Sequence, residues 1–130
     1  MALLVPDEGE VELLTRVVGL TCVYKLYQAN MTPAEGDTLS TYSGDIADFS
    51  GYANFTAAWG IPATSGGTTF VTGSSNMFQH NGGATSNTIY GYYVTDGSNT
   101  KLYWAEKFAA SKSMAAPADI IQLIPRLQAE

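Results

Sequence analysis

Residues 88–108 read TIYGYYVTDGSNTKLYWAEKF and hold six aromatic side chains around one polar loop. The β-branched and aromatic residues on either side of this loop predict two strands joined as a hairpin. A strand with one face in water alternates apolar and polar residues, because successive side chains point to opposite faces. In this hairpin, large rings fall on both faces. We therefore expect a packing partner on each side of the hairpin.

The six rings divide into two groups according to the period of two. One group is expected to fill the core of the domain, and the other to lie on the opposite face. Three rings left exposed would favour association, at roughly 25 cal/mol per Å² of apolar surface, and tyrosine is enriched where proteins meet. The sequence therefore predicts an interface on this second face. The rings assigned to the core are Tyr93, Trp104 and Phe108, and those assigned to the interface are Tyr90, Tyr92 and Tyr103.

The chain around the hairpin is also dominated by β-strand patterns. Short strands must cover one another's apolar faces, so the pattern predicts an antiparallel β-sandwich of jelly-roll-like type. The intervening segments are rich in turn residues and are expected to be loops. Further strands are predicted at residues 21–28, 51–59, 68–73 and 120–124, the last broken by Pro125, and loops at residues 31–49, 60–67 and 74–87.

One helix is predicted, near the N-terminus, over residues 8–18. Apolar residues recur there at helical spacing, Asp7 and Glu10 have the spacing of a capping box, and Gly19 supplies a stop. The apolar arm Leu3, Leu4 and Val5 precedes the helix, and we expect it to lie on its own domain or on a neighbour. We divide the chain into the arm and helix (residues 1–19) and a β-sandwich domain (residues 20–130).

Composition excludes several classes of function. The net charge is −6, and the six Lys and Arg residues are scattered, which argues against binding to nucleic acid through its phosphates. The first residues, MALLVPDEGEVELL, lack a basic segment, and their apolar run is too short for a signal peptide or a membrane span. We therefore expect a protein made in the cytoplasm, with no nucleic-acid partner and no membrane partner.

Sequence motifs give no catalytic residue, no metal ligand and no cofactor site. Cys22 is the only cysteine, and we expect it to be buried in a strand. His80 is the only histidine and is expected to lie in a loop, since no nearby cysteine completes a zinc site. No Gly-x-Ser-x-Gly motif is present, and the glycine-rich stretches lack the Gly-Lys-Ser/Thr ending of a phosphate-binding loop. These observations favour a protein that is not an enzyme.

Acidic side chains leave two alternatives open. Asp37, Asp45 and Asp48 occur within one predicted loop and offer oxygen ligands for calcium, although their spacing does not match an EF-hand. A solvated acidic loop explains them equally well. A pair of carboxylates on a β-sandwich could also serve a glycoside hydrolase.

Four segments carry a resemblance when taken in order. They are MALLVPDEGEVELLTRVVG, KLYQANMTP, DFSGYANFT and YGYYVTDGSNTKLYWAEKF. Together they resemble small structural virion proteins of tailed bacteriophages, of the capsid cement or decoration type. The resemblance covers most of the chain and consists of aromatic and turn residues rather than a catalytic motif. It implies a structural role, either on the capsid or in the tail or its fibres.

From the resemblance we expect a cement protein that binds the major capsid protein on the capsid surface of the virion, after synthesis in the host cytoplasm. Self-association is expected too, with a homotrimer favoured, because local three-fold sites occur between capsid capsomers and a ring at such a site must close on itself. The interface is predicted to contain the arm and one hairpin face, that is Leu3, Leu4, Val5, Tyr90, Tyr92 and Tyr103. The alternatives are a tail-fibre or receptor-binding component whose rings stack on host sugars, and a cell-wall hydrolase.

Overall fold

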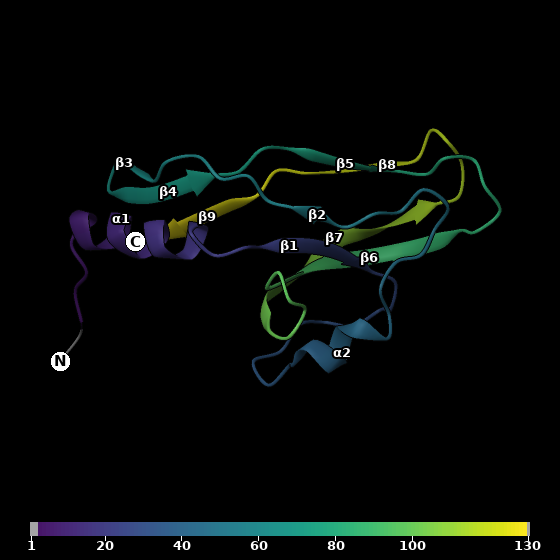
Figure 1. The fold of residues 1–130 in the computed structure, drawn as a ribbon, viewed down its shortest axis with the longest axis horizontal. Coiled ribbons are helices and arrows are strands. Elements are labelled where there is room, and N and C mark those ends of the chain that lie inside the picture. Colours follow the sequence, from purple (N-terminus) through teal and green to yellow (C-terminus); the bar gives the residue numbers. More distant parts are fainter. Residues whose placement is uncertain (1–2, 130) are drawn as a thin grey trace.

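The computed structural model describes residues 3–129 and is mainly β, with antiparallel sheets and an N-terminal helix (Figure 1). Its antiparallel β fold confirms the predicted fold class, and the layers described below are sandwich-like. The strand order does not confirm the jelly-roll comparison. The helices are α1 (Asp7–Val18) and α2 (Leu39–Ser43), and the strands are β1 (Val23–Tyr27), β2 (Phe55–Thr56), β3 (Ala63–Ser65), β4 (Thr68–Thr72), β5 (Asn76–Gln79), β6 (Asn87–Thr95), β7 (Leu102–Met114), β8 (Ile120–Leu123) and β9 (Arg126–Ala129).

The predicted hairpin is β6 and β7, and it belongs to a sheet with the order β2-β1-β6-β7. Its loop is organised by Asp96, whose carboxylate accepts hydrogen bonds from the backbone N–H groups of Thr100 (2.7 Å) and Lys101 (3.0 Å). Asn99 adopts a positive φ of 56° in the same loop, a conformation that asparagine tolerates better than most residues. These contacts give the turn a defined shape.

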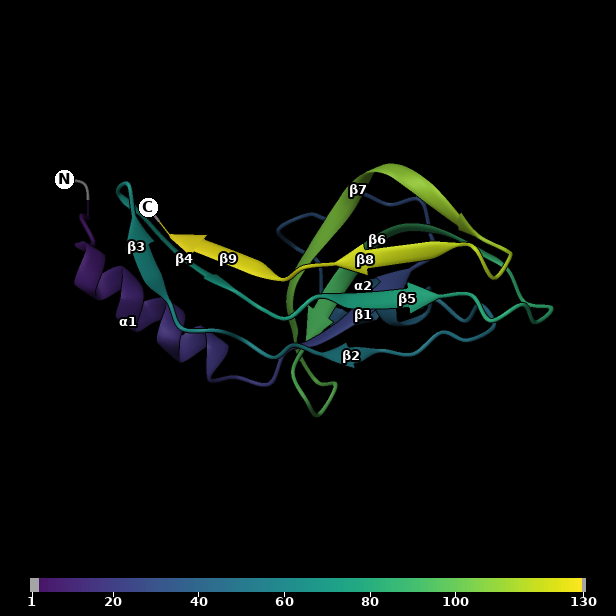
Figure 2. The same cartoon turned by 90° about the horizontal axis from the view of Figure 1, so that it is seen from above.

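A second layer covers one face of this sheet. Strands β5 and β8 pair with each other, and β4 pairs with β9 beyond them, so that β4–β5 and β8–β9 run as one long antiparallel ribbon (Figures 1 and 2). The ribbon is interrupted at Gly73 and Pro125, whose backbones share a hydrogen bond of 2.7 Å. The predicted break at Pro125 is therefore confirmed, and the chain resumes as β9 after it.

The opposite face of the sheet packs against the segment that contains α2 (Figure 1). Tyr42 of α2 lies fully buried against Tyr27 of β1 and Tyr93 of β6, with ring centroids 5.3 Å and 5.2 Å away. On the ribbon side, the core contains Leu26, Phe78, Ile89, Met114 and Ile121, among others. Strand β6 thus lies in the middle of three layers and is largely buried by the same chain on both faces, whereas much of β7 remains partly or fully exposed.

Helix α1 ends at Gly19 as predicted, but the predicted capping box is wrong. Pro6 occupies the N-cap position, and no side chain caps the helix. The Glu10 carboxylate instead accepts a hydrogen bond of 2.7 Å from the Thr69 hydroxyl in β4, and both side chains are buried. The helix packs against β3, β4 and β9, so the side chain expected to cap it ties it to the second sheet.

Several polar segments differ from expectation. Residues 31–49, predicted to be irregular, contain the short helix α2, which carries a capping box formed by Thr38 and Thr41. Residues 60–67 and 74–87, predicted to be loops, contribute β3 and β5, whereas the predicted strand at residues 51–59 is reduced to β2. Alternation is weak in β3 and β5, and pairing with β4 and β8 makes them strands.

Candidate functional site

The register of the hairpin overturns the expected division of its six rings. Val94 pairs with Trp104 and Tyr92 with Glu106, so Tyr92, Trp104 and Phe108 share the ribbon face, while Tyr93 lies on the α2 face. The physical reason is a register shift between Val94 and Thr95, next to the loop, which offsets β7 by one residue. A shift of one residue exchanges the two faces of a strand. The grouping of Tyr93 with Trp104 and Phe108 was therefore wrong.

Tyr92 is held by its own chain. Its ring stacks on Tyr24 at 5.4 Å and lies 6.2 Å from Phe108, and its hydroxyl donates a 2.7 Å hydrogen bond to Glu106 Oε2. Burial, followed by this hydrogen bond to Glu106, raises the pKa of Tyr92. The hydroxyl therefore stays protonated and keeps donating. Only part of this side chain is left for a partner.

Tyr90 lies at a second irregularity of the hairpin. Gly91 pairs with Lys107 and Ile89 with Lys112, so residues 108–111 of β7 lie opposite Tyr90 alone, and β7 arches away at this point (Figure 2). The partly buried Tyr90 side chain packs against the cluster of Tyr27, Tyr42 and Tyr93. A bulge of this kind bends the longer strand. Tyr90 thus contributes mainly to the packing of the α2 face.

Tyr103 is partly buried and stacks on Trp104 at 6.1 Å with an interplanar angle of 23°. Both residues line an open groove of about 370 Å³, together with residues 33–35, Asp37, Tyr42, Leu102 and Ala105. We call this the acidic groove, because its two charged lining residues are Glu35 and Asp37. Since β7 is the last strand of its sheet, the groove lies beside a strand edge that pairs with no other strand among residues 3–129.

Asp37 is the most ordered charged group in the acidic groove. Its Oδ2 atom accepts hydrogen bonds from the Tyr42 hydroxyl (2.7 Å) and from the backbone N–H of Ala34 (2.9 Å). The hydrogen bond from Tyr42, and to a smaller extent that from Ala34, lowers the pKa of Asp37. Burial, and to a smaller extent the hydrogen bond to Asp37, raises the pKa of Tyr42. The pair therefore consists of a carboxylate and a neutral hydroxyl.

A second groove, of about 310 Å³, opens on the ribbon side of β7. Tyr24, Tyr92, Phe108 and residues 122–125 line it, and Glu106 is its charged residue. It lies where the edge of β7 faces the end of β8, so the two layers are not in full contact there. Ile124 remains exposed at this point.

The two leucines of the N-terminal arm do not pack on the rest of the described chain. Leu3 and Leu4 are 91% and 83% exposed, whereas Val5 is partly buried beside Gly9. Leu13 of α1 is also exposed. Of the two expectations for Leu3 and Leu4, contact with their own domain is thus wrong, and contact with a neighbour stays a prediction.

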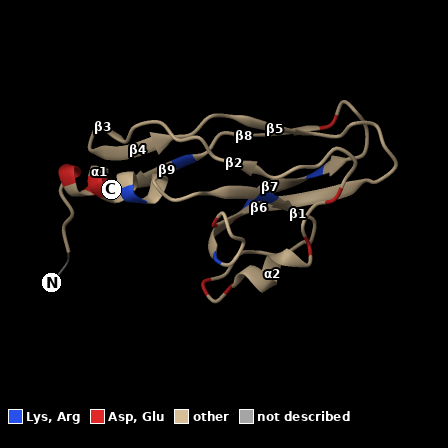
Figure 3. Cartoon of the chain, viewed as in Figure 1, with Lys and Arg blue, Asp and Glu red and all other residues tan. Residues whose placement is uncertain are grey.

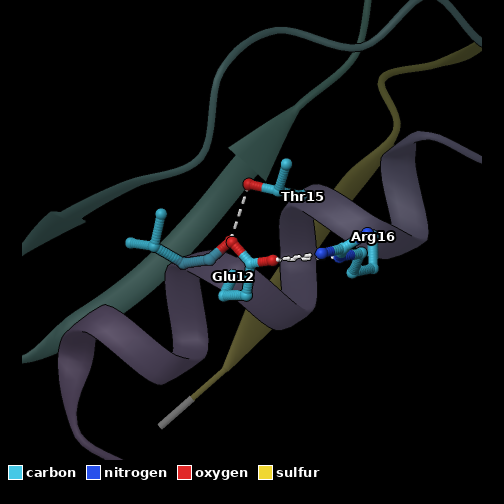
Figure 4. A network of polar contacts seen from close by, with 4 residues as sticks. Glu12, Thr15 and Arg16 are labelled. Atoms are coloured by element: carbon cyan, nitrogen blue, oxygen red, sulfur yellow. Dashed lines mark hydrogen bonds and ion pairs between the residues drawn. The ribbon is translucent and has the colours of Figure 1, made fainter.

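The exposed face of α1 is otherwise polar. Arg16 bonds to the Glu12 carboxylate at 2.8–2.9 Å, and the Thr15 hydroxyl donates to the Val11 carbonyl at 2.8 Å (Figure 4). An exposed pair of this spacing contributes about 0.3–0.5 kcal/mol. Across the described chain, acidic and basic side chains are dispersed without a basic patch (Figure 3).

The single cysteine and the single histidine of the sequence are both buried. Cys22 is buried as expected, although it directly precedes β1 rather than lying in a strand. Burial raises the pKa of its thiol, which disfavours the reactive thiolate. His80 lies in a loop as predicted, directly after β5, and is fully buried there. Its Nδ1 atom accepts a hydrogen bond from the Gly82 N–H (2.9 Å), so Nε2 carries the proton donated to the Thr85 carbonyl (2.9 Å). Both ring nitrogens are thus occupied in holding the loop.

No group of three or more His, Cys, Asp or Glu side chains suited to a metal ion occurs in the described part of the chain, so Asp37, Asp45 and Asp48 are not brought together. Neither helix among residues 3–129 is long and apolar enough to cross a membrane.

The comparisons with known proteins add no relative. No protein-family model matches the chain, and no match was found among curated proteins or solved structures. The function is therefore argued from the geometry of the chain.

Proposed function

We propose that this chain is a structural virion protein of a tailed bacteriophage, which binds the outer surface of the major capsid shell as an oligomer, with a trimer favoured. The observation that carries the proposal is the exposed arm. Leu3 and Leu4 extend into solvent although burying a leucine side chain is worth about 1.5–3 kcal/mol. A neighbouring subunit would supply that burial.

The three-layer core supports a mechanical role. Aromatic contacts join the layers, and a rigid body of this kind can hold two neighbouring capsid subunits at a fixed spacing. The arm and the outer edge of β7 offer two separate contact regions, which a clamp requires. Each bound copy would raise the force needed to separate the capsid subunits.

The test is incorporation into particles. The double variant Leu3→Ser, Leu4→Ser should bind phage capsids at least about tenfold more weakly than the native protein, because two apolar contacts are lost. Ile61→Ser is the matched control, since Ile61 is equally exposed at 91% but lies outside the arm. Copies per particle would be counted by quantitative gel analysis of purified virions. If the arm variant reached the same number of copies per particle as the native protein, the proposed role of the arm would be contradicted.

A tail-fibre or receptor-binding role is the second candidate. Tyr103 and Trp104 beside two carboxylates line an open groove, and such residues can contact a sugar. A glycan array would discriminate: saturable binding to one class of host glycan would favour adhesion over a cement role.

A further inference from the structure

We propose that the acidic groove binds an arginine side chain of a partner protein. The groove has a volume of about 370 Å³ and is open beside β7, the edge strand of its sheet. If the proposed function holds, this partner is a capsid subunit. That identification alone rests on the proposed function. The choice of arginine rests on the groove itself: on its charge, on the fixed orientation of the Asp37 carboxylate and on its aromatic lining.

The charge of the groove selects a cation. Both of its charged lining residues, Glu35 and Asp37, are acidic, and none of the residues that line it is Lys or Arg. The overall charge of −6 adds to this field. These two carboxylates would repel an anionic partner, and a neutral partner would gain hydrogen bonds from them but no attraction between opposite charges.

The lysines beside the groove in the sequence or in the sheet leave its carboxylates unpaired. Lys107, two residues beyond the lining segment, donates a 2.8 Å hydrogen bond to Asn30 Oδ1. Lys25 is buried, bonds to Asn99 Oδ1 and lies 5.9 Å from the centroid of the Tyr93 ring. Lys101 directly precedes the lining segment and is exposed, and no lysine forms an ion pair with Glu35 or Asp37 among the described residues. The two carboxylates therefore remain available to an incoming cation.

Asp37 is already arranged as an acceptor. The buried Tyr42 hydroxyl and the Ala34 N–H both bond to Oδ2, which fixes the plane of the carboxylate. Its other oxygen, Oδ1, accepts no hydrogen bond from the described residues. A ligand thus meets a charged oxygen whose orientation is already set, which reduces the ordering cost of binding.

Arginine fits this groove better than lysine. The guanidinium group is planar, presents several N–H donors in a fork, stacks on aromatic faces and is less strongly hydrated than an ammonium. Tyr103 and Trp104 supply aromatic lining, and Glu35 and Asp37 supply acceptors. A cation near an aromatic face gains additional electrostatic attraction. The combination of rings and carboxylates therefore points to a guanidinium group.

The experiment is an NMR titration of the purified ¹⁵N-labelled protein with the capped tripeptide acetyl-Gly-Arg-Gly-amide. The matched probe replaces arginine by citrulline, which keeps the shape and removes the charge. The arginine peptide should shift the amide signals of residues 34–37 and 102–105 in a saturable manner, and the shifts should weaken as salt is added. The citrulline peptide should leave these signals in place. Equal shifts with both peptides, shifts confined to other residues, or no shifts would each overturn the proposal.

Two variants sharpen the test. Glu35→Gln and Asp37→Asn should each raise the Kd of the arginine peptide by about threefold, as expected for loss of one partly exposed charge pair. Glu8→Gln removes the same charge from the exposed face of α1 and should leave the Kd unchanged. An equal loss in all three variants would mean that only net charge matters, which contradicts a specific site.

The outcome separates this inference from the proposed function, because the titration contains no particles. Absence of peptide binding together with normal incorporation into capsids would remove the arginine site and leave the cement role. Peptide binding without incorporation would keep the site and remove the cement role. Saturable glycan binding that shifts the same amides, with no arginine effect, would assign the groove to a sugar and overturn the proposal.

Discussion

Single residues decide whether loops of this protein have a fixed shape. Asp96 shows this best, since its carboxylate accepts hydrogen bonds from Thr100 and Lys101 and so closes the hairpin loop. The side chain of Thr100, then the backbone of Lys101 and of Thr100, lower the pKa of Asp96 to about 2. The charged form is therefore the one that stabilises the folded loop.

This shift predicts a pH dependence with a definite sign. Because the folded pKa of Asp96 lies below the unfolded value of about 3.9, its stabilisation is fully present above that value. The stabilisation is lost as the pH falls through about 2. The amide signals of Thr100 and Lys101 should titrate with a midpoint near that lower pH. In Asp96→Asn this transition should disappear, and a midpoint near 4 in the native protein would contradict the assignment.

His80 shows what sequence reasoning misses at the scale of a residue. A histidine between polar neighbours and before two glycines predicts a loop position, which the structure confirms, but it does not predict that the ring is fully buried. In the structure its ring lies 6.1 Å from Phe49 and bonds to two backbone groups of the loop. These partners depend on how the loop folds back, which the local sequence does not specify. The only possible signal was the lack of any other role for the residue.

Helices and strands with a clear hydrophobic periodicity were predictable from the sequence. Strands that form only because a neighbouring strand pairs with them were not. Helix α1 and strands β1, β4, β6 and β7 follow from hydrophobic spacing. Strands β3 and β5 are polar and are strands because neighbours pair with them. The register of the hairpin depends on irregularities near its loop and at Tyr90, and these decide which rings share a face. Sequence periodicity therefore predicted two apolar faces but not their membership.

Within the hairpin, Gly91 is required by a close approach of three chain segments. A Cβ atom there would collide with the Glu106 carbonyl oxygen and with the Tyr27 hydroxyl. Gly91→Ala should therefore lower the free energy of unfolding by about 1–3 kcal/mol, measured by urea denaturation. Gly36→Ala is the control, because a Cβ at Gly36 meets no atom within 4 Å. Equal stability of the two variants would show that β6 and β7 can separate at no cost.

At the scale of the whole molecule, the two apolar faces of the hairpin no longer argue for self-association. The ribbon covers one face and the α2 segment covers the other, so three layers account for most of the aromatic surface. The argument for a partner moves to the end of the molecule that carries the arm (Figure 1). Leu3 and Leu4 were part of the sequence prediction, whereas the acidic groove was not, because residues 33–37 and 102–105 meet only in the fold.

Sedimentation equilibrium can distinguish binding of the arm to a second copy of the chain from binding of the arm to the capsid. If the arm binds a second copy, the native protein should form a reversible oligomer, and Leu3→Ser, Leu4→Ser should be a monomer. Ile61→Ser should behave as the native protein does. A native protein that stays strictly monomeric at high concentration would contradict self-association. Loss of particle binding in the arm variant would then locate the arm contact on the capsid itself, because no oligomer would exist whose disruption could explain the loss.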